Sequence, residues 1–116
     1  MANVPVKIVK TLEPNAPSEG FTFTAAAAND TVQIEWDGKD TQTTVLVTAA
    51  AACELTVKAG DSLQAVNDQV IAVEKDKHLA FSLDSGRFKN LRGDLAGKVV
   101  MVPSGAVSLA VVETRV

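Results

Sequence analysis

The stretch Leu79–Glu113, LAFSLDSGRFKNLRGDLAGKVVMVPSGAVSLAVVE, decides the fold class of this chain. Short apolar runs alternate with polar residues along it, and residues 98–102 and 107–112 are rich in valine, which is β-branched and favours strands. The turn sequences Asp84–Gly86 and Pro103–Gly105 separate these runs. The stretch therefore predicts a series of short strands joined by turns.

The rest of the chain follows the same pattern. Residues 31–36 alternate, with Val32, Ile34 and Trp36 on one face, and no helical period is sustained long enough for an α/β fold. Strands spaced about 8–12 residues apart are typical of sandwiches and barrels. We therefore predict a single all-β domain over residues 1–116, an antiparallel β-sandwich or β-barrel of about eight to ten short strands. Trp36 and the four phenylalanines are the expected large core residues.

The N-terminal region predicts one strand followed by a loop. Residues 4–12 alternate as a strand, and Pro5 favours an edge position because proline lacks the N–H that a central strand needs. Residues 13–20, EPNAPSEG, predict a loop. An N-terminal arm is one interpretation of residues 1–20, and the apolar tail Leu109–Val116 is the second expected sheet edge.

Three shorter segments carry local expectations. Residues 21–24 and residues 87–91 each predict a short strand, the second with Phe88 opposite Arg87 and Lys89. Residues 25–30, AAAAND, predict a loop or a single turn, because Asn29-Asp30 closes the segment and isolated helices this short are unstable.

Composition narrows the expected partners. The net charge of −3 does not provide the broad positive field that sequence-independent nucleic-acid binding requires, so we expect no nucleic-acid partner. No apolar run approaches the roughly 20 residues that span a bilayer, and MANVPVKIVK lacks a signal-peptide pattern, so we expect no membrane partner and synthesis in a cytoplasm. Cys53 is the single cysteine, which excludes an intrachain disulfide and predicts a small core residue.

Few residues could support catalysis or metal binding. His78 is the only histidine, and its place after EKDK predicts an exposed turn residue rather than a catalytic base. The acidic residues Asp30, Glu35, Asp37 and Asp40 are interpreted as solvated turn residues, with a surface calcium site as the minor alternative. We expect no cofactor, no metal and no enzymatic activity.

The tripeptide Arg92-Gly93-Asp94 matches the RGD cell-adhesion ligand. It should occur by chance in about a few per cent of chains of this length, and its glycine and charges suit an ordinary loop tip. We interpret it as a loop, and a role in adhesion stays open.

Two segments, TVLVTAAAACELTVKAGDSLQAVND and LAFSLDSGRFKNLRGDLAGKVVMV with the final VSLAVVE, resemble small virion proteins of tailed bacteriophages. The shared pieces are Thr56–Gly60, Asn67–Asp68, Asp84–Asn90, Gly97–Val99 and Ala110–Glu113. Together they cover roughly the last seventy residues, and they are strand and turn signatures rather than catalytic motifs.

The resemblance implies a head decoration (cement) protein, a small β-rich domain on the capsid exterior of the virion. It implies the major capsid protein as partner and a homo-oligomer, with a trimer favoured. We expect contact through the N-terminal strand and the proline-rich loop, at Val4, Pro5, Val6, Lys7, Ile8, Pro14 and Pro17. A tail or neck protein is a close alternative. The alternative from another class is a β-sandwich module that binds carbohydrate or a host surface, for which Trp36 is the residue to test, although one Trp and no Tyr offer few aromatic platforms for a sugar.

Overall fold

A computed structural model of the chain describes residues 2–10, 17, 20–36, 40–61 and 67–113. Within these residues it contains ten strands, one helical turn (α1, Ser85–Phe88) and two 3-10 turns (η1, Asp40–Gln42; η2, Gly93–Leu95). The strands are β1 (Asn3–Val6), β2 (Ile8–Lys10), β3 (Thr24–Ala26), β4 (Thr31–Glu35), β5 (Thr43–Thr48), β6 (Cys53–Val57), β7 (Gln69–Val73), β8 (His78–Phe81), β9 (Lys98–Pro103) and β10 (Val107–Glu113).

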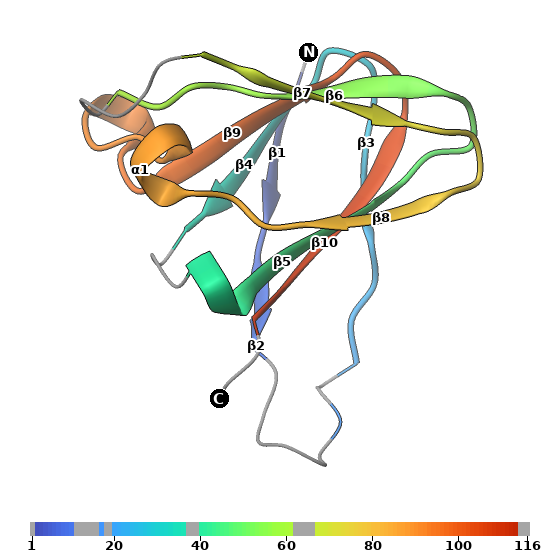
Figure 1. Ribbon diagram of the computed structural model, residues 1–116, viewed down its shortest axis with the longest axis horizontal. Coiled ribbons are helices and arrows are strands. Elements are labelled where there is room, and N and C mark those ends of the chain that lie inside the picture. The colour runs from blue at the N-terminus through green and yellow to red at the C-terminus, as the bar shows by residue number, and fades with distance from the viewer. Residues whose placement is uncertain (1, 11–16, 18–19, 37–39, 62–66, 114–116) are drawn as a thin grey trace.

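The strands form two five-stranded sheets that pack as a sandwich (Figure 1). The first sheet has the order β1-β4-β9-β6-β7. The second has the order β2-β10-β5-β8, and β3 also pairs with β10, beyond the end of β2. The predicted all-β sandwich is therefore confirmed.

The pairing is mixed rather than purely antiparallel. β1 runs parallel to β4, and β2 runs parallel to β10, while the other pairs are antiparallel. Both parallel pairs come from the N-terminal segment, which joins each sheet at its edge. An alternation pattern carries no information about strand direction, which explains why the sequence did not indicate these two pairs.

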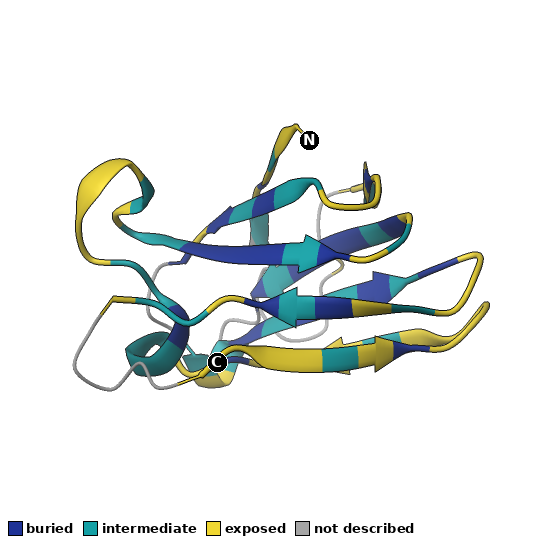
Figure 2. Cartoon of the chain, turned by 90° about the horizontal axis from the view of Figure 1, so that it is seen from above, coloured by how far each residue is buried: buried dark blue, intermediate teal, exposed yellow. Residues whose placement is uncertain are grey.

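The core lies between the sheets and is built from β-branched and aliphatic residues. Buried positions alternate with more exposed ones along β4 and β5, whereas β9 and β10 each carry a run of three buried residues (Figure 2). The expected inward set of β4 is confirmed, since Val32, Ile34 and Trp36 are buried, and Val45, Val47 and Leu55 of β5 and β6 are fully buried beside them. Trp36 is 2% exposed and is the largest buried side chain.

The phenylalanines divide between the core and the surface. Phe88 is buried and Phe81 packs partly against the core, whereas Phe21 and Phe23 are each 40% exposed. The expectation that all four fill the core is therefore wrong. The expected strand at residues 21–24 instead lies at Thr24–Ala26, because Ala26 and Thr24 pair with Val107 and Leu109 of β10.

The expected strand at residues 87–91 is also wrong. The chain forms the helical turn α1 there, because the Asp84 side chain accepts a hydrogen bond from the Gly86 amide at 2.9 Å and caps the turn. Only a single bridge, between Lys89 and Val99, remains of the expected pairing.

Both predictions about the chain ends need correction. The N-terminal strand breaks at Lys7 into β1 and β2, which belong to different sheets, so residues 3–10 are part of the sandwich rather than a free arm. The edge position of Pro5 is confirmed. The tail is not an edge, because β10 has β5 on one side and β2 and β3 on the other; residues 114–116 lie outside the described residues.

Candidate functional site

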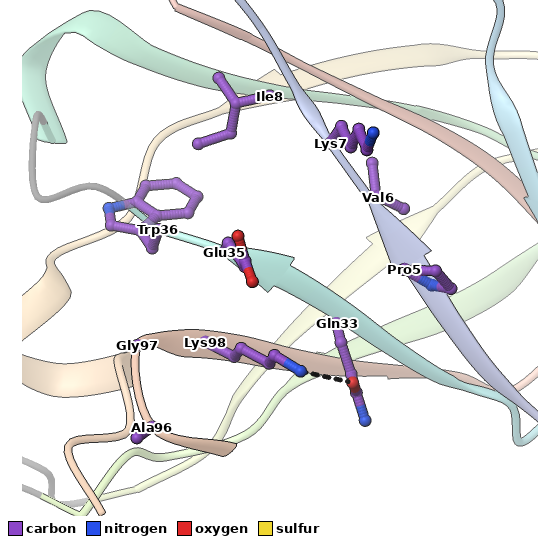
Figure 3. Close-up of a pocket in the computed structure, with 10 residues that line it drawn as sticks. All are labelled: Pro5, Val6, Lys7, Ile8, Gln33, Glu35, Trp36, Ala96, Gly97 and Lys98. Atoms are coloured by element: carbon purple, nitrogen blue, oxygen red, sulfur yellow. Dashed lines mark hydrogen bonds between the residues drawn. The ribbon is translucent and has the colours of Figure 1, made fainter. Parts of the chain in front are cut away.

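A groove lies where the N-terminal segment crosses from one sheet to the other. The parallel register of β1 with β4 ends at Val6 and Ile34, and the chain leaves the first sheet at Lys7 to pair with β10 from Ile8 onward. β4 continues to Glu35 beyond the end of its β1 partner. This divergence opens a groove of about 630 Å³ between the crossing segment and the end of β4 (Figure 3).

Two walls from different parts of the chain line the groove. The N-terminal wall is formed by residues 5–8, and the opposite wall combines β4 with the turn before β9. The full lining is Pro5, Val6, Lys7, Ile8, Gln33, Glu35, Trp36, Ala96, Gly97 and Lys98.

The charged groups of the groove stand at its rim, whereas its base is apolar. Lys7 and Glu35 are exposed, and the Lys98 amine donates to the side-chain oxygen of Gln33 at 3.4 Å. Val6 and Trp36 are buried beneath them. Two amines and one carboxylate around an apolar base can hold a partly charged partner segment, and this attraction would weaken with added salt.

Hydrogen bonds fix the position of Trp36. Its backbone N–H donates to the Gly97 carbonyl at 3.0 Å, and its Nε1 donates to Asp40 Oδ1 at 2.8 Å. Asp40 Oδ2 accepts from both the backbone N–H and the hydroxyl of Ser85, each at 3.0 Å. Partial burial opposes ionisation of Asp40, but the hydrogen bonds from Ser85 and Trp36 outweigh it and hold the pKa of this carboxyl below its usual value.

The structure distributes the predicted contact residues over different environments. Val6 belongs to the core, and Val4 and Ile8 pack partly against it. Pro5 and Lys7 are exposed, and so is Pro17, whereas Pro14 lies outside the described residues. Of the predicted contact residues, four line the groove: Pro5, Val6, Lys7 and Ile8.

Edge strand β1 is a poor template for strand addition. It spans four residues, and Pro5 removes one of its few backbone donors. The opposite wall of the groove was not predicted, because Gln33 and Lys98 are far apart in the sequence and meet only through the pairing of β4 with β9. No sequence pattern links these positions.

The other residues considered for chemistry are dispersed. His78 is exposed at the start of β8, as expected. Cys53 is half-buried and packs against the core. Asp30 accepts from the backbone N–H groups of Ala2 and Ala27, which lowers the pKa of its carboxyl.

Within the described part of the chain, no group of three or more His, Cys, Asp or Glu side chains could hold a metal ion, and no helix is long and apolar enough to cross a membrane. Asp37, a member of the acidic group considered for calcium, lies outside the described residues. Trp36 cannot serve as a sugar platform, because its ring is buried.

The Arg92–Asp94 tripeptide lies on an exposed loop around η2. Asp61 holds the start of this loop, since its carboxylate accepts from the backbone N–H groups of Leu91 at 2.6 Å and Arg92 at 3.1 Å. Gly93 has φ +72°, a conformation that suits glycine. These contacts account for the loop as a structural element of the domain.

Comparison with known proteins identifies no relative, since no protein family, no curated protein and no solved structure matches this chain.

Proposed function

We propose that this chain is a head decoration protein of a tailed bacteriophage, which binds the major capsid protein on the outside of the expanded head and stabilises the shell. It acts by binding alone, as a homo-oligomer for which we favour a trimer, and it uses no cofactor. The proposal rests on the resemblance in the second half of the sequence. One structural observation supports treating that resemblance as meaningful: the separate motifs contact one another.

The first of these contacts joins the TVKAG segment to the DSGRFKN block. Gly60 lies directly against this block, and its backbone N–H donates to the Arg87 carbonyl at 2.8 Å. The Asn-Asp turn joins the same segment, because Asp68 accepts from the Ala59 N–H at 2.7 Å and forms a salt bridge with Lys58 at 3.1 Å. Motifs separated by more than twenty residues in the sequence thus form one connected unit.

A second set of contacts joins the DSGRFKN block to the Gly-Lys-Val strand. The Asn90 N–H donates to the Lys98 carbonyl at 2.9 Å, and its side-chain amide donates to the same carbonyl at 3.0 Å. The Gly97 N–H donates back to the Asn90 carbonyl at 2.7 Å. The pieces that carry the resemblance are therefore neighbours in the fold. This proximity is the observation that carries the proposal.

A small rigid domain suits the proposed role. Decoration of a shell multiplies many weak contacts over a repeated lattice, so each copy needs only a modest binding surface. The buried Trp36 gives no support to the alternative of a carbohydrate-binding module. A tail or neck protein remains the variant that uses the same fold for the same kind of contact.

The proposal is tested with heads of the virus that encodes this chain, expanded and stripped of their own copies. Purified protein should co-sediment with these heads and saturate at a number of copies set by the lattice symmetry, and it should raise the temperature at which the heads rupture. Purified tails and unexpanded heads serve as controls. Binding to tails alone would move the protein to the tail, and binding to neither structure would refute a virion role.

A further inference from the structure

The two outer faces of the sandwich differ in charge. Alternation places one set of residues of each strand outside, opposite the buried set. On the second sheet these outward residues, among those whose exposure is described, include no Asp, Glu, Lys or Arg. They are Val9, Ala25, Thr44, Leu46, Thr48, His78, Ala80, Ser108, Ala110 and Val112, of which Ala110 is covered by its neighbours and only 3% exposed. We call this surface the neutral face.

Strand register makes the neutral face continuous. Val112 lies between Val9 and Thr44, and in the next row Leu46 lies between Ala110 and Ala80. A third row runs from Ala25 through Ser108 and Thr48 to His78 at the edge. Methyl and hydroxyl groups therefore cover the face, and the single titratable side chain stands at one corner.

The outer face of the first sheet provides a contrast within the same molecule. Three of its outward positions carry charged side chains: Glu35 and Glu54 are exposed, and Lys98 is half-buried. In a chain with 22% charged residues, the absence of charge is thus specific to one sheet. A continuous surface without charge is a candidate contact surface.

Two exposed aromatic residues extend the apolar character of this sheet. Phe21 and Phe23 stack with their ring centroids 6.4 Å apart just before β3, and each is 40% exposed. Both lie within four residues of Ala25, a member of the neutral face. Exposed aromatic side chains are favoured anchors in protein interfaces.

The size of the neutral face indicates what kind of partner it fits. Four strand widths of about 4.8 Å and a length of about six residues give roughly 400 Å². A stable interface needs about 800 Å² from each partner. By this estimate the face alone falls short of a stable dimer interface, and it suits a contact that is repeated over a lattice.

We propose that the neutral face is the surface through which this chain contacts the shell, and that it meets an uncharged protein surface rich in apolar and hydroxyl groups. This inference rests on the proposed function and assigns the contact to the outside of the second sheet instead of the groove at the N-terminal edge. An interface without charge should be insensitive to salt, whereas contact through Lys7 and Glu35 of the groove should weaken as salt increases.

The test compares substitutions on the two outer faces in the head co-sedimentation assay. Leu46→Lys places a charge at the centre of the neutral face. Ala80→Lys places a charge on edge strand β8, at a position that is already exposed. Thr56→Lys is the matched control, because Thr56 is a half-exposed outward residue on a central strand of the first sheet. Lys7→Glu tests the groove. All four proteins are first checked for wild-type thermal unfolding.

Leu46→Lys and Ala80→Lys should weaken head binding at least about tenfold, since each buries an unpaired ammonium group. Thr56→Lys and Lys7→Glu should bind within about twofold of wild type, and wild-type binding should persist from about 0.05 M to about 0.5 M NaCl. Unchanged binding by Ala80→Lys, or loss of binding with Lys7→Glu and with salt, would overturn this inference while leaving the decoration role intact.

Two further outcomes distinguish the proposals. If wild-type protein binds no heads, both proposals fail together. If sedimentation of the free protein shows an oligomer that Leu46→Lys dissociates, the neutral face holds a second copy of the chain, and the assignment to the shell is overturned.

Discussion

Substitution of Gly60 by alanine should destabilise the fold more than its single methyl group would suggest. A Cβ atom at this position would lie 2.4 Å from the Lys89 carbonyl oxygen, 2.9 Å from the Lys89 carbonyl carbon and 3.0 Å from the Phe88 carbonyl carbon. All three are backbone atoms, so no side-chain rotation can relieve the clash. Gly60 does not have a positive φ, and the cost therefore comes from lack of space alone.

Relief of this clash requires a backbone shift that separates the end of β6 from α1. Overpacking of this kind costs about 1–3 kcal/mol, and weakening the Gly60–Arg87 hydrogen bond adds about 1 kcal/mol. We expect the free energy of unfolding to fall by about 2–4 kcal/mol. For a domain of this size, the melting temperature should fall by roughly 8–16 °C.

Thermal and urea unfolding followed by circular dichroism would measure this effect, with an unchanged urea m-value indicating that only stability has changed. Gly20→Ala is the matched control, because a Cβ at Gly20 meets nothing within 4 Å, and it should alter stability by less than about 0.5 kcal/mol. A Gly60→Ala protein that melts within about 2 °C of wild type would refute the close approach between the two motifs.

Substitutions at three other positions test separate parts of the structure. Val6→Ala should lower the free energy of unfolding by about 2 kcal/mol in urea titrations, because Val6 is 5% exposed; an unaffected midpoint would mean that β1 is a free arm after all. Asp40→Ala should cost about 1–3 kcal/mol, since it leaves Trp36 Nε1 and both Ser85 donors without their acceptor. The pKa of Asp40 is lowered in the folded protein, so its contribution is present above the unfolded value of 3.8 and is lost as the pH falls through the folded pKa. The stability difference between wild type and Asp40→Asn should accordingly shrink below about pH 4, and a difference that grows there would contradict the assignment. Asp61→Ala should speed hydrogen exchange at the Leu91 and Arg92 amides with little change in melting temperature, and unchanged exchange at both amides would show that Asp61 does not hold the loop.

The sequence by itself determined the fold class and the inward residues of most strands. Val32, Ile34, Val45, Val47, Leu55 and Val57 alternate with polar neighbours, and a period of two leaves only one way to bury them. Pro5 also indicated an edge strand correctly, because its missing N–H is a local property of the residue. Such features depend on each residue and its nearest neighbours in the sequence.

Local signals were misleading where a side chain competed with the backbone pattern. Residues 87–91 alternate like a strand, yet the Asp84 carboxylate caps a helical turn, Ser85–Phe88, that includes the first two of them. The break at Lys7 has no strong sequence marker, because both halves of the N-terminal segment are apolar and suit a strand. Only the available edges of β4 and β10 decide that each half joins a different sheet.

Tertiary structure alone created both candidate contact surfaces. The groove brings Lys7 and Lys98 to one site through the order β1-β4-β9, and the neutral face depends on which strands lie side by side in the second sheet. A strand's alternation states which residues face outward but not which outward residues become neighbours. Long-range strand pairing decides which outward residues become neighbours. The uncharged surface therefore forms only because β10 pairs with both β2 and β5.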